Sequence, residues 1–341
     1  MDFLCLIKEG TDVLHISYAG TKGKLSVVTC AILSMLLPFV IIACGNTTPT
    51  PVHIPTPARA PAAPISLLSL PAPRYTYEKQ INISYGPLPE EKLDLCYPTD
   101  ARGVRPGILI IHGGGWTRGD KQGLGGDCAN LARQGFVVGN INYRLATNKQ
   151  PATQWPAPLV DAQLAVRWLR AQAGNLNMDP QRLCAWGTSA GAHLAVFLGA
   201  LKTIHPGDEA ELLVEQSPSV SCVVDYFGPT DLTQKFPLLT SQIATMFGKA
   251  TLQSDPLLYR DASPIFSIAA DTAPMFIVQG TQDTTVPPSQ SLMLLRALQQ
   301  YKIPVQYISY NGGHSFYGLS GRQHMSIYAQ LYDYLIKLEH P

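Results

Sequence analysis

The chain has 341 residues, of which 46% are hydrophobic, and a formal net charge of +1. Only 14% of the residues are charged, against about 25% in typical soluble domains, and no run rich in Lys and Arg is present. The composition therefore gives no electrostatic case for a nucleic-acid partner, and the length suits one large globular domain with an appendage.

An uncharged apolar run occupies residues 25–44 and follows two lysines. Twenty such residues are enough to span a bilayer. The run ends in Val40-Ile-Ile-Ala-Cys44-Gly, which resembles the lipobox of bacterial lipoproteins, in which the cysteine is lipidated. We expect residues 1–44 to be a lipoprotein signal with lipidation at Cys44, or else a retained membrane anchor. In both cases the rest of the chain lies outside the cytoplasm, held at the cell envelope.

Residues 45–74 are rich in Pro, Thr and Ala and carry almost no charge. Closely spaced prolines favour extended polyproline conformation and cannot build a core. We interpret this segment as a semi-rigid tether, although a leader without any role would have the same composition. The folded domain is expected over residues 75–341.

Four cysteines, Cys96, Cys128, Cys184 and Cys222, follow the tether. An oxidising compartment would permit disulfides between them. Cys184 and Cys222 lie in apolar strand-like runs, however, where a small buried thiol is the commoner state. The chain has no Cys-x-x-Cys pair and no His-Glu-x-x-His motif, so we expect neither a metal site nor a cofactor.

Strand and helix patterns alternate from Tyr75 onward. Residues 107–112 form a continuous aliphatic run, which is typical of a central strand covered on both faces. The alternation predicts an α/β fold with a mostly parallel central sheet flanked by helices. The remaining strands are predicted at 80–84, 92–97, 136–143, 183–187, 220–227, 275–279 and 305–310, and helices at 127–134, 158–173, 192–200, 289–300 and 323–338.

Residues 229–263 interrupt this alternation and carry an apolar face. The segment follows the carboxyl end of a predicted strand, where open α/β sheets bind their ligands. We expect a small cap insertion over the site, although an ordinary surface helix would give the same pattern. The apolar residues are Phe236, Leu238, Leu239, Ile243, Met246 and Phe247.

The motif Gly187-Thr188-Ser189-Ala190-Gly191 joins a predicted strand to a run of small residues that suits a helix. A serine at such a turn takes a strained backbone conformation, and the flanking glycines avoid clashes where strand and helix cross. The motif alone also fits a glycine-rich connection without a catalytic role. The remaining motifs make Ser189 the candidate nucleophile.

A glycine-rich loop, His112-Gly-Gly-Gly-Trp116, ends another predicted strand. Consecutive glycines allow backbone N–H groups to point at one oxyanion. We assign the N–H groups of Gly114, Gly115 and Ala190 to an oxyanion hole. A phosphate-binding loop is the alternative, but the chain lacks the Gly-Lys-Ser/Thr and Gly-x-Gly-x-x-Gly motifs of such loops.

Ser189 requires a base, and the base requires a carboxylate partner. His193 lies one helical turn beyond the serine and cannot easily reach over it, whereas His314 follows a predicted strand within Asn311-Gly-Gly-His-Ser-Phe316. Asp283 lies at the end of the preceding strand and upstream of His314, as the acid should. The alternative acids are Asp225 and Asp231.

These motifs together resemble the α/β-hydrolases, and more narrowly the hormone-sensitive-lipase-like esterases and the bacterial acetyl- and feruloyl-esterase type. The segments Trp116-Thr-Arg-Gly-Asp-Lys121 and Asn142-Tyr-Arg144 are also similar to this group. The resemblance covers residues 75–341 and implies substrate contacts by Trp116 and Tyr143. A proline tether replaces the N-terminal cap helix of many lipase-like relatives, which favours a more open cleft.

The resemblance implies a serine carboxylesterase that acts on short-chain acyl esters, including acetylated or feruloylated carbohydrate. Asp283 would orient His314, and His314 would deprotonate Ser189. An arylformamidase-type amide hydrolase uses the same residues and is the first alternative. A non-catalytic binding protein with the same fold is the second, although such proteins usually lack a triad member.

Overall fold

The computed structural model describes residues 15–18, 26–29, 70–206 and 211–339. Residues 1–58 form a unit of their own, in which β1 (His15–Tyr18) pairs antiparallel with β2 (Ser26–Thr29). The rest of the predicted anchor, including Cys44, and the tether up to residue 69 lie outside the described residues. None of the helices in the described ranges is long and apolar enough to cross a membrane.

The second unit, residues 59–341, is built on an eight-stranded sheet. The strand order is β10-β9-β8-β7-β5-β6-β4-β3, and only β4 runs antiparallel to its two neighbours. The predicted, mostly parallel α/β sheet is therefore confirmed. The strands are β3 (Tyr77–Ser84), β4 (Lys92–Pro98), β5 (Arg105–Ile111), β6 (Val137–Ile141), β7 (Met178–Thr188), β8 (Cys222–Tyr226), β9 (Met275–Gly280) and β10 (Val305–Tyr310).

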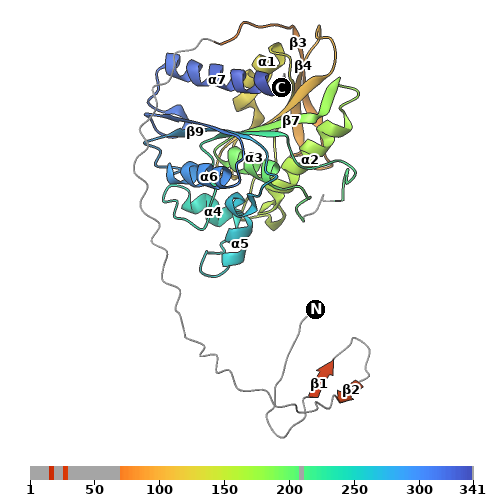
Figure 1. Ribbon diagram of the computed structural model, residues 1–341, viewed down its shortest axis with the longest axis vertical. Coiled ribbons are helices and arrows are strands. Elements are labelled where there is room, and N and C mark those ends of the chain that lie inside the picture. The colour runs from red at the N-terminus through yellow and green to blue at the C-terminus, as the bar shows by residue number, and fades with distance from the viewer. Residues whose placement is uncertain (1–14, 19–25, 30–69, 207–210, 340–341) are drawn as a thin grey trace, which may run out of the picture. The chain divides into compact units, whose positions relative to one another are not determined.

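Helices cover both faces of this sheet (Figure 1). One face carries α1 (Gly125–Arg133) and α7 (Gly321–Glu339), and the other carries α2 (Ala157–Ala171), α3 (Ala190–Ala200) and α6 (Ser289–Gln300). Residues 108–111 of β5 are fully buried because both faces are covered. Short 3₁₀ turns occupy η1 (Lys121–Leu124), η2 (Pro151–Thr153), η3 (Pro264–Ser267) and η4 (His314–Phe316).

The insertion at residues 229–263 carries α4 (Thr240–Met246) and α5 (Pro256–Asp261). Its predicted apolar residues are buried, except Leu238, which is 57% exposed. A Cβ atom added at Gly115 would lie 2.9 Å from Cγ of Gln242, so α4 packs directly against the glycine loop. The insertion therefore lies at the carboxyl ends of the strands, where a small cap was expected.

Two disulfides join the four cysteines of this unit: Cys96–Cys128 and Cys184–Cys222. Their Cα–Cα distances of 5.8 and 4.5 Å lie within the range that a disulfide requires. The expectation that Cys184 and Cys222 are free thiols is therefore wrong. The two residues are direct partners across the adjacent strands β7 and β8, a register that the local apolar pattern does not reveal.

The chain contacts this unit slightly before the predicted boundary at residue 75. The side-chain amide of Gln134 donates to the carbonyl oxygens of Pro71 and Ala72, both at 3.1 Å. The backbone N–H groups of Arg74 and Tyr75 both donate to the carbonyl of Arg133, at the end of α1. The last residues of the predicted tether are thus part of the folded unit.

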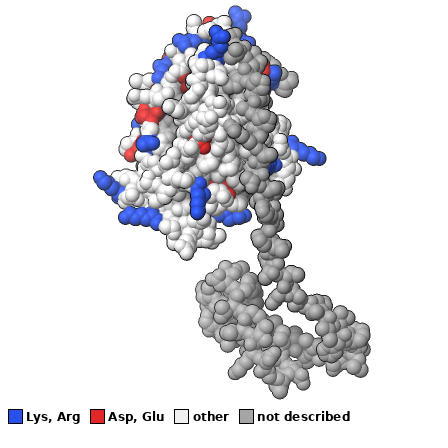
Figure 2. All heavy atoms as spheres, turned by 90° about the vertical axis from the view of Figure 1, so that its left-hand side faces the viewer, with Lys and Arg blue, Asp and Glu red and all other residues white. Residues whose placement is uncertain are grey.

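Charged residues are sparse on the face drawn in Figure 2. Lys and Arg on this face stand apart among uncharged residues and do not merge into a continuous basic surface. The part of this face that Figure 2 leaves uncovered thus shows no continuous basic surface.

Candidate active site

Ser189 lies at the turn between β7 and α3. Its backbone angles, φ 54° and ψ −118°, are rare for a residue with a side chain. The turn requires glycine on both sides, because a Cβ at Gly187 would clash with the carbonyl of Gly191 and a Cβ at Gly191 would clash with the carbonyl of Ile111. The close crossing of strand and helix thus holds the serine at the carboxyl edge of the sheet.

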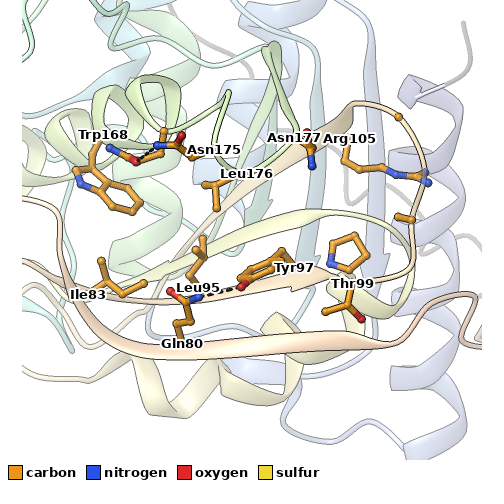
Figure 3. A pocket seen from close by; sticks show the side chains of 14 residues that line it. Gln80, Ile83, Leu95, Tyr97, Thr99, Arg105, Trp168, Asn175, Leu176 and Asn177 are labelled. Atoms are coloured by element: carbon orange, nitrogen blue, oxygen red, sulfur yellow. Dashed lines mark hydrogen bonds between the residues drawn. The ribbon is translucent and has the colours of Figure 1, made fainter.

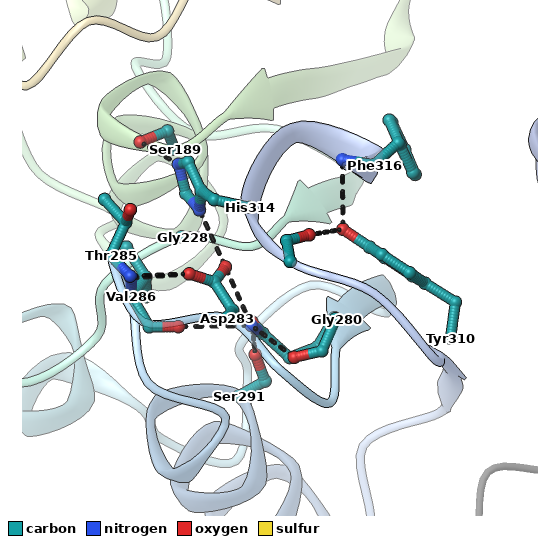
Figure 4. Close-up of polar contacts among 12 residues, drawn as sticks. Ser189, Gly228, Gly280, Asp283, Thr285, Val286, Ser291, Tyr310, His314 and Phe316 are labelled. Atoms are coloured by element: carbon teal, nitrogen blue, oxygen red, sulfur yellow. Dashed lines mark hydrogen bonds and ion pairs between the residues drawn. The ribbon is translucent and has the colours of Figure 1, made fainter. Parts of the chain in front are cut away.

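Three side chains that are far apart in the sequence form one chain of contacts (Figure 4). His314 Nε2 lies 3.0 Å from Ser189 Oγ, and His314 Nδ1 lies 2.7 Å from Asp283 Oδ2. Ser189, Asp283 and His314 follow β7, β9 and β10 respectively, so parallel strands deliver all three to the same edge. The structure brings together the predicted nucleophile, acid and base.

Hydrogen-bond donors surround the Asp283 carboxylate, which is 4% exposed. Its Oδ1 accepts from the backbone N–H groups of Thr285 and Val286, both at 2.9 Å. The carboxylate is therefore the acceptor in its contact with His314, which places the imidazole proton on Nδ1. Nε2 is then left as an acceptor facing Ser189.

Gln279, which no sequence motif marked as functional, also holds the carboxylate. Its Nε2 donates to Asp283 Oδ2 at 3.2 Å, while its Oε1 accepts from Ser291 Oγ at 2.5 Å. Gln279 is fully buried at the end of β9. An amide at the end of an otherwise aliphatic strand was the available sequence signal.

The loop that carries His314 is fixed by two aromatic residues. Tyr310 Oη donates to the carbonyl of Gly313 at 2.7 Å and accepts from the backbone N–H of Phe316 at 3.1 Å. The Phe227 ring packs edge-on against the imidazole, with 4.8 Å between ring centroids. These contacts hold a backbone that passes through positive φ at Ser315 and Phe316.

The glycine loop runs directly past the serine. A Cβ added at Gly113 would lie 3.2 Å from the Cβ of Ser189. Gly114 and Gly115 have φ of 119° and 60°, so both use conformations that favour glycine. Within the described part of the chain, the backbone N–H groups of Gly114, Gly115 and Ala190 donate to no other residue. These N–H groups are available to a substrate oxygen.

Trp116 and Tyr143 lie beneath the glycine loop and not in contact with solvent. Trp116 is fully buried, and its Nε1 donates to His193 Nδ1 at 3.2 Å. Tyr143 is 1% exposed and donates through Oη to the carbonyl of His112 at 3.1 Å. Through these contacts both side chains support the glycine loop, and their contact with the substrate stays a prediction.

Polar contacts hold the segments Trp116-Thr-Arg-Gly-Asp-Lys121 and Asn142-Tyr-Arg144 in place. Asn142 Nδ2 donates to Asp120 Oδ2 at 2.8 Å, which ties the segment after β6 to the segment after the glycine loop. The adjoining Lys121 pairs with the buried Asp94 at 2.7 Å. Arg144 forms a buried ion pair with Asp161 of α2. The two segments are thus joined to each other, to β4 and to α2.

The remaining acid and base candidates have other roles. His193 is fully buried, and burial lowers its pKa to about 4. Because its Nδ1 accepts from Trp116, Nε2 carries the proton and donates to the carbonyl of Ala262 at 2.8 Å. Asp225 accepts from the backbone N–H of Gly228, and Asp231 from that of Thr233. None of these three residues forms a hydrogen bond or ion pair with His314 in the described structure.

Among the described residues, no group of three or more His, Cys, Asp or Glu side chains is arranged to hold a metal ion. The arrangement at the carboxyl edge instead combines a hydroxyl, an imidazole, a carboxylate and unpaired N–H groups. This set can support nucleophilic attack on a carbonyl carbon and stabilise the resulting oxyanion.

The chain is similar to known proteins in sequence and in fold. Residues 93–298 match the family model BD-FAE. The chain is 32% identical to the probable carboxylic ester hydrolase LipM of Mycobacterium tuberculosis, over 61% of this chain and 48% of LipM. It is 29% identical to the esterase LipC of the same organism, over 73% of this chain and 62% of LipC. The chain thus spans about half to three-fifths of the length of these relatives.

Solved structures of esterases have the same fold. A truncated carbohydrate esterase from gut microbiota aligns with a TM-score of 0.66 and 25% identity, over 80% of this chain and all of the other. An acetyl ester-xyloside bifunctional hydrolase from Caldicellulosiruptor lactoaceticus aligns with a TM-score of 0.60 and 25% identity, over 72% of this chain and 88% of the other.

Proposed function

The chain belongs to the BD-FAE family and has the α/β-hydrolase fold, and we propose that it is a serine carboxylesterase that removes short acyl groups from carbohydrate esters. The observation that carries this proposal is the contact chain Ser189–His314–Asp283 beside unpaired backbone N–H groups. The names of the relatives, which include esterases and a carbohydrate esterase, support the same reaction class.

In the first half of the reaction, Ser189 Oγ attacks the carbonyl carbon of the ester while His314 Nε2 accepts the hydroxyl proton. The carbonyl oxygen becomes an oxyanion, and the N–H groups of Gly114, Gly115 and Ala190 donate to it. Collapse of this intermediate breaks the bond to the alcohol. The alcohol leaves with the proton from His314, and the acyl group remains on Ser189.

In the second half, water attacks the acyl-enzyme and His314 again accepts a proton. The ester bond to Ser189 breaks, the serine recovers its proton from His314, and the carboxylic acid is released. Asp283 keeps the imidazole in one tautomer and stabilises its charged form in both halves. Gln279, which donates to Asp283 Oδ2, positions that carboxylate.

Two observations support short acyl groups on a carbohydrate. Helix α4 approaches the glycine loop closely enough that Gln242 meets Gly115, which limits the room beside the oxyanion hole. The two structural neighbours at 25% identity are described as a carbohydrate esterase and an acetyl ester-xyloside hydrolase.

We also propose that the enzyme works outside the cytoplasm, held at the cell envelope by lipidation at Cys44 or by a retained anchor within residues 1–44. Two buried disulfides are in keeping with an oxidising compartment. Metabolic labelling with a palmitate analogue checks the lipid. Loss of the label in Cys44→Ala supports lipidation, and an unlabelled wild-type chain in the membrane fraction supports the retained anchor.

The test of the reaction uses a fluorophosphonate probe together with p-nitrophenyl acetate. The wild-type protein should react with the probe and release nitrophenol, whereas Ser189→Ala should do neither and should keep its circular dichroism spectrum. Ser289→Ala, which alters an exposed serine at the start of α6, is the matched control. Retained turnover in Ser189→Ala would disprove the proposal. Faster turnover of an N-formyl aromatic amine than of the acetyl ester would favour the arylformamidase alternative.

A further inference from the structure

A groove separate from the Ser189 site opens between β3, β4 and the end of α2, and Figure 3 shows the residues that line it. It has a volume of about 540 Å³, which is within the range of pockets that bind small ligands. Arg105, at the start of β5, lines it, whereas the other end of β5 leads into the glycine loop. Since a strand rises about 3.3 Å per residue, β5 separates the hollow from the oxyanion hole by about 20 Å.

The two walls of this groove come from different elements (Figure 3). Gln80 of β3 and Tyr97 of β4 lie on one side, and Trp168 near the end of α2 lies on the other. Tyr97 and Trp168 are only partly buried, so part of each ring system is open to solvent. A partly exposed aromatic residue on each wall offers an apolar surface on which a flat ligand can stack.

The polar lining of the groove consists mainly of primary amides. Gln80 Nε2 donates to Tyr97 Oη at 2.8 Å, and Asn175 Nδ2 donates to Gln172 Oε1 at 3.0 Å. These contacts orient the amides and leave further donors and acceptors, among them Gln172 Nε2, Asn175 Oδ1 and the Asn177 side chain, directed to no other described residue. A ligand with many hydroxyl groups would provide hydrogen-bond partners for both the donors and the acceptors.

The charge of the residues that line the groove indicates which class of ligand can bind there. Arg105 is the one charged side chain among the residues that line the groove, and its guanidinium lies 4.7 Å from the ring centroid of Tyr75. A neutral ligand therefore suits the groove better than a cationic one. A proline-rich peptide, such as the chain's own tether, also stacks on aromatic rings, but its prolines lack N–H donors and would leave the amide oxygens without partners.

We propose that this groove is a binding site for a neutral oligosaccharide, separate from the catalytic site. The pyranose rings would stack on Trp168 and Tyr97, and their hydroxyls would bond to the Gln and Asn amides. Its consequence for catalysis rests on the proposed esterase function: a glycan held at this site raises the local concentration of its ester groups near Ser189.

Binding is tested with the full-length Ser189→Ala protein and unesterified xylohexaose, cellohexaose and mannohexaose, by calorimetry and ligand-observed NMR. At least one oligosaccharide should bind. Adding Trp168→Ala should weaken binding about tenfold, the effect expected from losing one aromatic contact, whereas Trp168→Phe should keep most of the affinity. Tyr301→Ala, which removes a 43% exposed aromatic at the end of α6, is the matched control and should have no effect.

A second variant keeps the result interpretable if Trp168→Ala fails to fold. Gln172→Ala with Asn175→Ala changes only partly buried or exposed amides and should also weaken binding. Absence of binding by all three oligosaccharides, or binding that neither variant weakens, would overturn the proposal. Binding of a synthetic peptide of residues 46–65 in place of the sugars would instead make the tether the occupant and would equally overturn it.

Catalysis provides an independent readout. In the Ser189-containing protein, Trp168→Ala should lower the rate on an acetylated polysaccharide relative to the rate on p-nitrophenyl acetate. Binding is measured without catalysis. The experiments therefore distinguish failure of the oligosaccharide-binding proposal from failure of the esterase proposal. An inactive protein that still binds oligosaccharide refutes only the esterase, and an active protein that does not bind refutes only the groove.

Discussion

The indole Nε1 of Trp116 donates a hydrogen bond to Nδ1 of His193 across 3.2 Å of buried space. Trp116 directly follows the glycine loop, and His193 lies in the first turn of α3 that begins at Ala190. This single contact therefore joins the glycine loop to the start of α3, the two segments whose N–H groups we propose as the oxyanion hole. His193 also donates to the carbonyl of Ala262, so the same ring connects the insertion at residues 229–263 to both segments.

Trp116→Phe should therefore lower both stability and activity. The substitution keeps an aromatic ring but leaves His193 Nδ1 buried without a donor, which costs about 1–3 kcal/mol. Because the loop is less firmly held, we expect kcat to fall by up to about 10²-fold, the effect of one misplaced oxyanion donor. Denaturant unfolding and steady-state kinetics with p-nitrophenyl acetate measure the two effects.

Trp186→Phe is the matched control for that variant. Trp186 is 1% exposed, and its Nε1 donates to no described residue, so this substitution removes no protein hydrogen bond. It should leave kcat close to the wild-type value. Equal losses of kcat in the two variants would show that the contact between Trp116 and His193 does not position the loop.

Asp283→Asn should reduce kcat by about 10⁴-fold, because an amide cannot hold the imidazole in the tautomer that accepts the serine proton. Asp225→Asn should retain most of the activity, since Asp225 bonds to Gly228 and not to His314. The ratio of the two kcat values shows which aspartate is the carboxylate partner of His314. A large loss in Asp225→Asn, with little change in Asp283→Asn, would reverse the assignment.

Asp225 also gives stability a distinct pH dependence. Burial raises the pKa of its carboxyl to about 7 in the folded protein, from about 3.8 in the unfolded chain. Between these values the unfolded chain has lost the proton that the folded protein keeps, so the contribution of Asp225 to stability falls as the pH rises and then levels off above about pH 7. Asp225→Asn removes this loss, because an amide does not titrate.

The free energy of unfolding of Asp225→Asn should therefore exceed that of the wild type by an amount that grows from about pH 4 to pH 7. A pKa difference of this size corresponds to on the order of 4 kcal/mol. Urea unfolding at pH 4, 6 and 8 measures the difference. A stability gap that stays constant over this range would contradict the proposed protonation of Asp225.

Replacing both Cys96 and Cys128 by Ser should lower stability without abolishing activity. The disulfide closes a loop with a sequence separation of 32 residues between β4 and α1, on a face of the sheet away from Ser189. Loss of a crosslink of this length costs about 3–4 kcal/mol. Thermal unfolding measures the effect, and mass spectrometry of the unreduced wild type checks both bridges. Free thiols at all four positions would contradict the pairing.

Gln242→Ala should shift activity toward longer acyl chains. The Gln242 side chain faces Gly115 of the glycine loop, and its truncation opens space beside the proposed oxyanion hole. We expect kcat/KM for p-nitrophenyl hexanoate to rise relative to that for the acetate. Ser241→Ala, at the neighbouring exposed position on α4, should leave this ratio unchanged. An unchanged ratio in Gln242→Ala would place the acyl group elsewhere.

The sequence by itself determined the order of strands and helices and the place of Ser189, because both depend on local physics. An aliphatic run such as residues 107–112 favours a central strand wherever it lies, and the clash at Gly187 involves only the backbone of the same turn, at Gly191 and Ala192. The order Ser189, Asp283, His314 followed from strand ends that must meet at one edge.

Only the tertiary structure decided what depends on pairing across the fold. Cys184 and Cys222 form a bridge because β7 and β8 are neighbours in register, and Trp116 is buried because its ring meets His193 of another element. The support of Asp283 by Gln279 and the amide-lined groove between β4 and α2 arise in the same way. Contacts between residues far apart in the chain leave no periodic signal, so their partners became evident only when the elements were packed together.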